Sequence, residues 1–354
     1  MVRKINGVSL IKVFSFLTIF FLHIEKISQI STNNIARYGV YLFIILSGFL
    51  MMYNYETKIN DVNLKSVFVF LKNKILKFYP LFLIGLIIKA PVSLLKYYYE
   101  FNGLGIPFFI NSFLRLLSSV FLIQAFIPDP NYHFAFNGVS WFLDVLIFCY
   151  IFTPSLIKIL NSNSKKKNAI LLFSIIIIQL IIQFVIDTYV GDDFWYYIFP
   201  PYRLLDYISG MLLYKMVKEN LYDDSKKMKQ YSIYEAIIIL LIFCFIRFNL
   251  FICSEPLYIF SLLTIVVFIQ NKGILSQKLN NMRWVNKMCA INLELFLLHQ
   301  PLIRYIEFIV EKLNISSRIF SILASFITFI LIYFVCNIYN KKITNSKKEV
   351  KAHE

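Results

Sequence analysis

Charged residues are scarce in this sequence of 354 residues: they make up 16% of the chain, while hydrophobic residues make up 58%. A soluble domain averages about a quarter charged residues, so the composition indicates that lipid surrounds most of the chain. About ten apolar segments of membrane-spanning length divide the sequence and leave no stretch long enough for a soluble domain. We therefore expect one integral membrane domain over residues 1–345, followed by a basic cytoplasmic tail at 346–354.

Cysteine is rare, and internal repeats are not detectable. The five cysteines are scattered through apolar segments, at Cys149, Cys244, Cys253, Cys289 and Cys336. They lack the spacing of metal ligands and do not support a disulfide framework, so we expect neither a metal nor a permanently bound cofactor. Many transporters contain inverted repeats with broken helices at matching positions, so the lack of repeats disfavours that class.

The chain has few acidic residues, and its net charge is +16. The basic residues cluster in short connections between apolar segments, which is typical of cytoplasmic loops and argues against nucleic-acid binding. Arg3 and Lys4 precede the first apolar run as they would in a signal peptide. However, Glu25 and Lys26 follow it in place of a small-residue cleavage site, so we expect a retained span.

The apolar windows predict an all-α polytopic membrane protein. The expected spans are 8–25, 38–54, 75–95, 139–158, 169–189, 201–217, 232–252, 257–271, 289–310 and 319–340. A shorter apolar piece, 113–127, is expected to be an interfacial or re-entrant helix, because only then do the basic loops gather on one side of the bilayer. This arrangement places both termini in the cytoplasm, at a plasma membrane that we expect to be bacterial.

Two ionisable residues, Lys12 and His23, lie inside the first apolar run. Their separation of eleven residues is almost three helical turns, so both side chains leave the same face, roughly 16 Å apart along the axis. A buried ionisable group costs a few kcal/mol to insert and usually has a function or a partner. His23 is suited to take a proton from a hydroxyl that attacks an acyl carbon. The alternatives are an interfacial histidine and a lysine that extends to the cytoplasmic surface.

Further polar residues in apolar surroundings are weaker candidates for a site. Ser47 and Gly48 suit close helix packing or backbone approach to a ligand. Lys74 and Lys77 share a helical face at the expected cytoplasmic mouth of the third span, where they would bind the phosphates of acyl-CoA or simply follow the positive-inside rule. Trp141 suits either an interfacial aromatic belt or stacking on a sugar.

Five other residues are candidates for the lining of an acceptor cavity, and each has a structural alternative. Asp144 lies within two turns of the expected start of its span. Arg203 and Asp206 are three residues apart and can pair within one helix. Glu294 and His299 belong to the ninth expected span and must face protein or water rather than lipid.

The order of these elements along the chain resembles the membrane acyltransferase-3 family. The elements are Lys12-x10-His23, Ser47-Gly48-Phe49, the Lys74 and Lys77 pair before Tyr79-Pro80, Trp141-Phe142-Leu143, Arg203 with Asp206 and Gly210, and Leu298-His299-Gln300-Pro301. The similarity extends from about residue 4 to residue 340.

This resemblance implies an enzyme that transfers an acyl group, usually acetyl, from cytoplasmic acyl-CoA to a hydroxyl of an envelope or capsular glycan or its lipid-linked precursor. His23 would be the catalytic histidine and Lys12 its paired basic residue, with acetyl-CoA as co-substrate. Lys74 and Lys77 stand where the family usually has arginines that contact the donor, and lysine cannot grip a phosphate with two parallel hydrogen bonds. The alternative function is a transporter or flippase for a glycan or lipid-linked sugar.

Overall fold

The computed structural model describes residues 5, 7–32, 35–59, 62–221, 228–248, 254–313 and 317–353, and every regular element in this part of the chain is helical. The all-α prediction is therefore confirmed. The long helices are α1 (Gly7–His23), α3 (Ile35–Tyr55), α4 (Leu64–Glu100), α5 (Ile106–Val120), α7 (Trp141–Ser162), α8 (Lys165–Tyr189), α10 (Pro200–Val217), α11 (Met228–Arg247), α12 (Ser254–Phe268), α15 (Asn292–Lys312) and α16 (Arg318–His353). The short ones are α2 (Glu25–Ser28), η1 (Gln124–Phe126), α6 (Pro130–His133), α9 (Phe194–Tyr197), α13 (Ile274–Asn280) and α14 (Arg283–Ala290).

Each of the ten predicted spans overlaps one long helix. Six helices of the described part are long and apolar enough to cross a membrane, namely α3, α4, α7, α8, α11 and α16. The chain is thus a multi-pass membrane protein, while the number of about ten spans stays a prediction. The ninth predicted span, 289–310, is divided at Ile291 between α14 and α15, and the predicted start of the tail at residue 346 falls inside α16.

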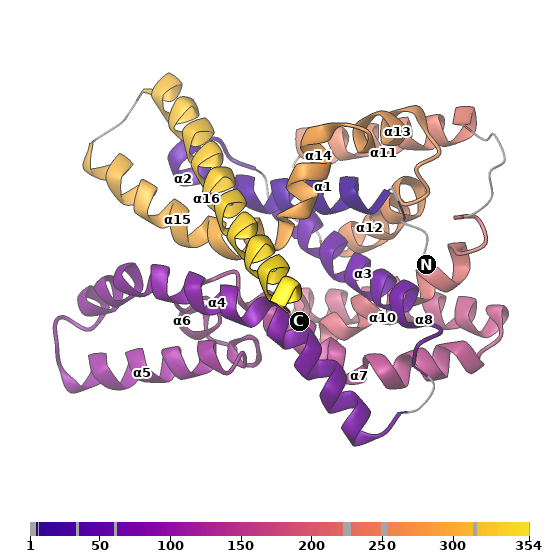
Figure 1. Cartoon of the computed structure of the whole chain (residues 1–354), viewed down its shortest axis with the longest axis horizontal. Helices are drawn as coiled ribbons and strands as arrows, with labels where there is room; N and C mark the ends of the chain where they lie inside the picture. The colour runs from indigo at the N-terminus through magenta and orange to yellow at the C-terminus, as the bar shows by residue number, and fades with distance from the viewer. Residues whose placement is uncertain are drawn as a thin grey trace.

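The centre of the molecule is α3, which packs between α1 and α10 (Figure 1). Two glycines permit its close approach to α10. A Cβ atom at Gly48 would lie 1.9 Å from the carbonyl oxygen of Tyr207, and one at Gly210 would lie 1.9 Å from that of Ile45. Any side chain at either position would therefore force the two backbones apart.

Helix α4 is the longest continuous helix, with 37 residues. It begins at a capping box in which Asn63 and Ser66 exchange hydrogen bonds between side chain and backbone. Figure 1 shows that α4 changes direction midway. The helix contains Pro80 and Pro91, and an internal proline removes a backbone donor and crowds the preceding turn. The bend brings the second half of α4 alongside α15.

Helix α5, which overlaps the predicted 113–127 helix, has its polar side turned inward. Its buried residues include Ser112, Arg115 and Ser119, whereas Phe109 and Phe113 are 60% and 58% exposed. An apolar outer face with a polar inner face is expected of a helix that contacts lipid. Nη1 and Nη2 of Arg115 donate to the Glu100 carboxylate, at 2.9 and 2.6 Å, which ties α5 back onto the end of α4.

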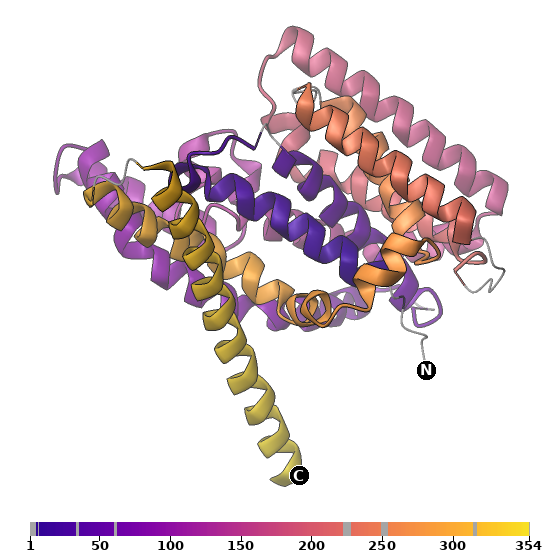
Figure 2. The ribbon, with the colours of Figure 1, turned by 90° about the horizontal axis from the view of Figure 1, so that it is seen from above.

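The outermost helices are apolar and poorly covered. Only 17% of the most apolar stretch of α8 is buried, and 11% of that of α11, compared with 78% for α3. Helix α16 leaves the body of the molecule and projects from it (Figure 2). Surfaces of this size and composition are stable in a bilayer and not in water.

Candidate functional site

A cavity of about 690 Å³ lies where α1, α4, α7, α9 and α15 converge. Its volume falls within the range of about 300–1,000 Å³ that is typical of small-molecule sites. Among the residues that line it are His23, Lys26, Lys89, Ser93, Lys96, Tyr97, Trp141, Phe142, Tyr197, Phe296, Gln300, Arg304, Glu307 and Glu311. Helix α1 delivers His23 as its last residue, so the imidazole stands at the point where the apolar helix gives way to the polar lining.

A second imidazole lies directly behind His23. The ring centroids of His23 and His299 are 5.2 Å apart, so the two rings are in contact. His299 is fully buried and is not part of the cavity wall. Phe16 meets it edge-on with a centroid distance of 5.5 Å, and Phe20 lies 6.5 Å away, so α1 holds both imidazoles in place.

The hydrogen bonds of His299 define which ring nitrogen carries the proton. Its Nδ1 lies 2.9 Å from the carbonyl oxygen of Leu295 and 2.8 Å from that of Phe296. Carbonyl oxygens only accept hydrogen bonds, so Nδ1 must be protonated. Nε2 of the neutral ring then has a free lone pair, and this atom is buried without a hydrogen-bond partner in the described part of the chain. Because it lies beside His23, this buried acceptor can accept a hydrogen bond from the His23 ring.

Aromatic rings form a second part of the cavity wall. The rings of Trp141 and Tyr197 are 5.5 Å apart, and those of Phe142 and Phe296 are 5.0 Å apart. Two guanidinium groups make cation–π contacts with the Tyr197 ring. The guanidinium carbon of Arg37 lies 4.9 Å from the ring centroid, and that of Arg203 lies 5.0 Å from it. Rigid aromatic faces next to polar groups are suited to stack on sugar rings.

Lys12, which we predicted to be the basic partner of His23, and the predicted donor-binding Lys74 and Lys77 lie away from this cavity. Lys12 is half-buried on α1, and its carbonyl oxygen accepts a hydrogen bond of 3.3 Å from Asn292. Lys74 sits among the rings of Tyr55, Phe70 and Tyr150, with Nζ 4.3 Å from the centroid of Tyr55. Lys77 is exposed. Along its own helix, each of the three lysines comes before the residues that line the cavity. The three therefore lie toward the end of the bundle that is opposite the cavity.

Nearly the whole sequence also matches a known protein family. A family model described as an acyltransferase domain matches residues 5–338. The chain belongs to the acyltransferase-3 family. Searches of the curated proteins and of the solved structures return no match.

Of two residues of this acyltransferase that we predicted for donor binding, Gly48 lies at the contact between α3 and α10, and Ser47 bonds within α3. Gly48 is the point of close approach described above, and the hydroxyl of Ser47 donates to the carbonyl oxygen of Phe43 at 2.7 Å. Neither lines the cavity of His23. Their positions match a packing role, which the sequence left open beside the donor-binding one.

Besides His299, which lies behind the cavity wall, four residues that we predicted for the acceptor cavity of the acyltransferase lie outside it. Asp144 accepts a hydrogen bond of 2.8 Å from the backbone N–H of Ala125 and so anchors the turn at η1. Glu294 accepts one of 2.7 Å from Asn340 and so joins α15 to α16. One oxygen of each carboxylate is bonded to a nearby protein group outside the cavity.

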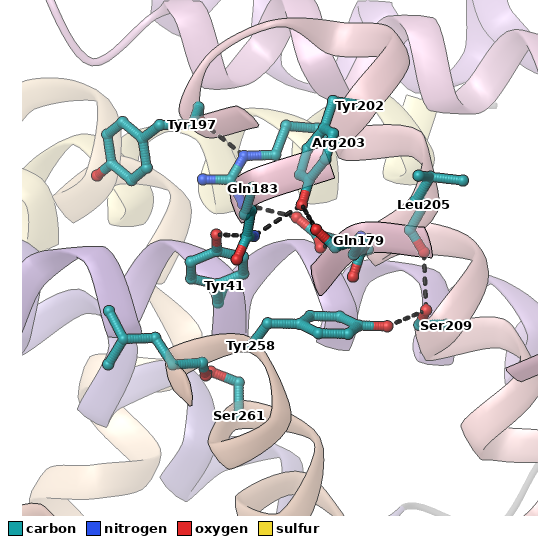
Figure 3. A network of polar contacts seen from close by, with 12 residues as sticks. Tyr41, Gln179, Gln183, Tyr197, Tyr202, Arg203, Leu205, Ser209, Tyr258 and Ser261 are labelled. Carbon is teal, nitrogen blue, oxygen red and sulfur yellow. Dashed lines mark hydrogen bonds and ion pairs between the residues drawn. The ribbon is translucent and has the colours of Figure 1, made fainter. Parts of the chain in front are cut away.

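The other two, Arg203 and Asp206, form a fully buried ion pair of 2.6 Å. Figure 3 shows the surrounding network, in which Arg203 also donates to the carbonyl oxygen of Tyr197 and stacks on Tyr41. Gln179 donates to Asp206 at 2.8 Å. The pair is a structural link between α10, α8 and α3.

Sequence reasoning did not single out several residues of the acyltransferase cavity. Lys89, Gln300 and Arg304 line the wall or mouth, and Tyr197 forms part of the aromatic wall. Lys89 carries the same signal that drew attention to Lys12, an isolated lysine in an apolar run, and could have been found in the same way. Gln300 is adjacent to the predicted His299. The position of Tyr197 depends on how the short helix α9 packs, which the local sequence does not specify.

Proposed function

We propose that this acyltransferase transfers an acetyl or related acyl group from acyl-CoA to a hydroxyl of a cell-envelope or capsular glycan, or of its lipid-linked precursor. The observation that carries the proposal is the position of His23 on the wall of the cavity, with the buried imidazole of His299 behind it. Membership of an acyltransferase family supports the reaction type.

In this mechanism the acceptor hydroxyl binds beside His23 and is activated by it. The imidazole removes the hydroxyl proton as the oxygen forms a bond to the acyl carbon of the thioester. The carbon–sulfur bond then breaks, and the CoA thiolate takes the proton from His23 as it leaves. Direct transfer requires the acceptor oxygen and the acyl carbon to be held about 3–3.5 Å apart.

His299 acts on this step through His23. Its free Nε2 would accept a hydrogen bond from the His23 ring, which fixes the tautomer of His23 and stabilises the imidazolium formed during transfer. In this role His299 is a positioning residue, because it lies behind the wall and does not contact the acceptor.

Donor and acceptor would approach from opposite ends of the bundle. The cavity opens at the His23 end of α1, whereas Lys12, Lys74 and Lys77 lie toward the other end. With both termini in the cytoplasm, acyl-CoA would meet the three lysines on the cytoplasmic side, and the glycan would enter from outside. The acyl-bearing arm of the donor would reach His23 through the bundle.

The first prediction concerns His23→Ala. We expect the variant to abolish O-acetylation of the surface glycan, since the His23 imidazole would be the base that takes the hydroxyl proton. The measurement is linkage-resolved NMR of glycan from a strain that lacks the protein, complemented with either the wild type or the variant. The matched control is Phe21→Ala, which changes a 51% exposed neighbour on the same helix.

Equal O-acetylation by wild type and a stably inserted His23→Ala protein would refute the catalytic role. Glycan that reaches the surface in lower amount, with unchanged O-acetyl content per repeat, would instead identify a transporter.

A further inference from the structure

We propose that the acceptor glycan is anionic and that Lys89 pairs with a carboxylate or phosphate group on it. The inference rests on the proposed function, because it assigns a chemical class to the acceptor of that reaction. The inference is based on the charged residues of the cavity wall and not on its aromatic rings.

Lys89 is a cation that the protein itself leaves unpaired. Its side chain is 7% exposed and lines the cavity from the second half of α4. It makes no hydrogen bond or ion pair within the part of the chain that the structure describes, and the Glu307 carboxylate is already bonded to Arg304. The ammonium group has little exposed surface and no paired anion among the described residues, so an anion that enters the cavity gains a strong pairing with it.

The other charged residues of the cavity add to its positive charge. Four cations, Lys26, Lys89, Lys96 and Arg304, line the cavity together with two carboxylates, Glu307 and Glu311. A concave site with an excess of one sign concentrates ligands of the opposite sign. The exposed Lys26 and Lys96 lie at the rim, and the buried Lys89 lies deeper, so an anionic chain would be drawn inward.

The site belongs to the acceptor rather than to the phosphates of CoA. Lys89 follows Lys77 by twelve residues on α4, which is roughly 18 Å of helix. It lies within electrostatic range of His23 and in the same cavity as Trp141 and Tyr197, the rings suited to sugar stacking. The anionic group would therefore sit close to the hydroxyl that is acylated. A lysine binds as a point charge, so carboxylate and phosphate both fit.

The test uses protein in lipid nanodiscs and the surface glycan of a strain that lacks it. One portion of the glycan is left intact, one is carboxyl-reduced and one is dephosphorylated. Transfer of labelled acetyl from acetyl-CoA and direct binding of each glycan are measured for wild type, Lys89→Gln and Lys89→Arg. The matched control is Lys72→Gln, an exposed lysine on α4 outside the cavity.

We expect one of the two treatments to weaken binding and raise KM by about tenfold or more, and the effective treatment identifies the anionic group. Lys89→Gln should cause the same loss with intact glycan and no further loss with the treated glycan. Lys89→Arg should retain most of the affinity, and Lys72→Gln should behave as wild type.

Equal binding and transfer of intact and neutral glycan would overturn the inference and leave the proposed function in place. Displacement of the glycan by adenosine 3′,5′-bisphosphate, weakened by Lys89→Gln, would also overturn it, because the site would then serve the donor. If wild-type protein transfers no acetyl at all, the proposed function fails, and the binding measurements alone decide the inference.

Discussion

At the scale of single residues, the protein handles buried polar groups in two ways. Asp144 and Glu294 each accept a hydrogen bond from a protein group outside the cavity. Nε2 of His299, next to His23, has no hydrogen-bond partner in the described part of the chain, and Lys89 on the cavity wall makes no ion pair there. Both groups therefore have a bonding capacity that the described protein leaves to the cavity and to His23.

The role of His299 can be tested with two substitutions. His299→Phe keeps a flat ring against Phe16 and removes the lone pair. We expect kcat to fall by roughly tenfold to a hundredfold and the KM for the acceptor to stay nearly constant, because the ring acts through His23. His299→Gln, which retains a side-chain acceptor, should recover part of the rate. The measurement is steady-state acetyl transfer in nanodiscs; a change confined to KM would contradict the positioning role.

How far the sequence predicts the site can be seen from individual residues. Local sequence patterns predict His23 and Trp141 as site residues, and in the structure both line the same cavity. The same kind of pattern predicts Asp144, three residues after Trp141, as a site residue. Its carboxylate instead accepts a hydrogen bond from the backbone N–H of Ala125. The direction that a polar side chain takes depends on which helix packs beside it, and this long-range information is not contained in a local pattern.

At the scale of elements, the positions of the helices were predictable because membrane helices depend on local composition. An apolar run must close its own backbone hydrogen bonds, so the windows at 38–54 and 169–189 correspond to α3 and α8. The full extent of α4, from Leu64 to Glu100, was missed because its two ends are too polar for a hydropathy window. The inward polar face of α5 likewise depends on its contact with Glu100.

The crossing of α3 and α10 gives a prediction at this scale. Gly48→Ala and Gly210→Ala each place a methyl group within 1.9 Å of a backbone oxygen on the facing helix. We expect each to lower Tm by about 5 °C or more in detergent, because a packed helix pair accommodates extra atoms only by moving apart. Gly105→Ala is the control, since its nearest neighbour is Pro107 at 3.5 Å. Unchanged Tm for both test variants would contradict the assigned packing.

At the scale of the whole molecule, the end opposite the cavity is held by an ionic cluster. The Glu56 carboxylate, just after α3, accepts hydrogen bonds from Lys215 at 2.8 Å and Lys218 at 2.9 Å. Its backbone carbonyl accepts another from Asn161 at the end of α7. Burial by itself raises the pKa of Glu56, but the two lysines outweigh this effect and hold its pKa below the ordinary value.

This cluster predicts a pH dependence of stability. A carboxylate with a lowered pKa in the folded state stabilises the protein above the ordinary glutamate pKa of about 4.3, and this contribution is lost as the pH falls through the folded pKa. We expect Glu56→Gln to lower Tm by roughly 2–4 °C at pH 7, and the difference from wild type to shrink below pH 4. Glu219→Gln, which breaks an exposed pair with Lys165, should have little effect. A constant difference across this pH range would contradict the assignment.

The ion pair of Arg203 and Asp206 has a consequence for the biogenesis of the protein. A lone arginine or aspartate at the centre of a helix costs about 2.5–3.5 kcal/mol during insertion by the translocon. These two lie one turn apart on the same helix, and their charged atoms are 2.6 Å apart. As the predicted span 201–217, α10 would therefore bring its own counter-ion into the bilayer, and it could enter before α3 and α8 have assembled around it.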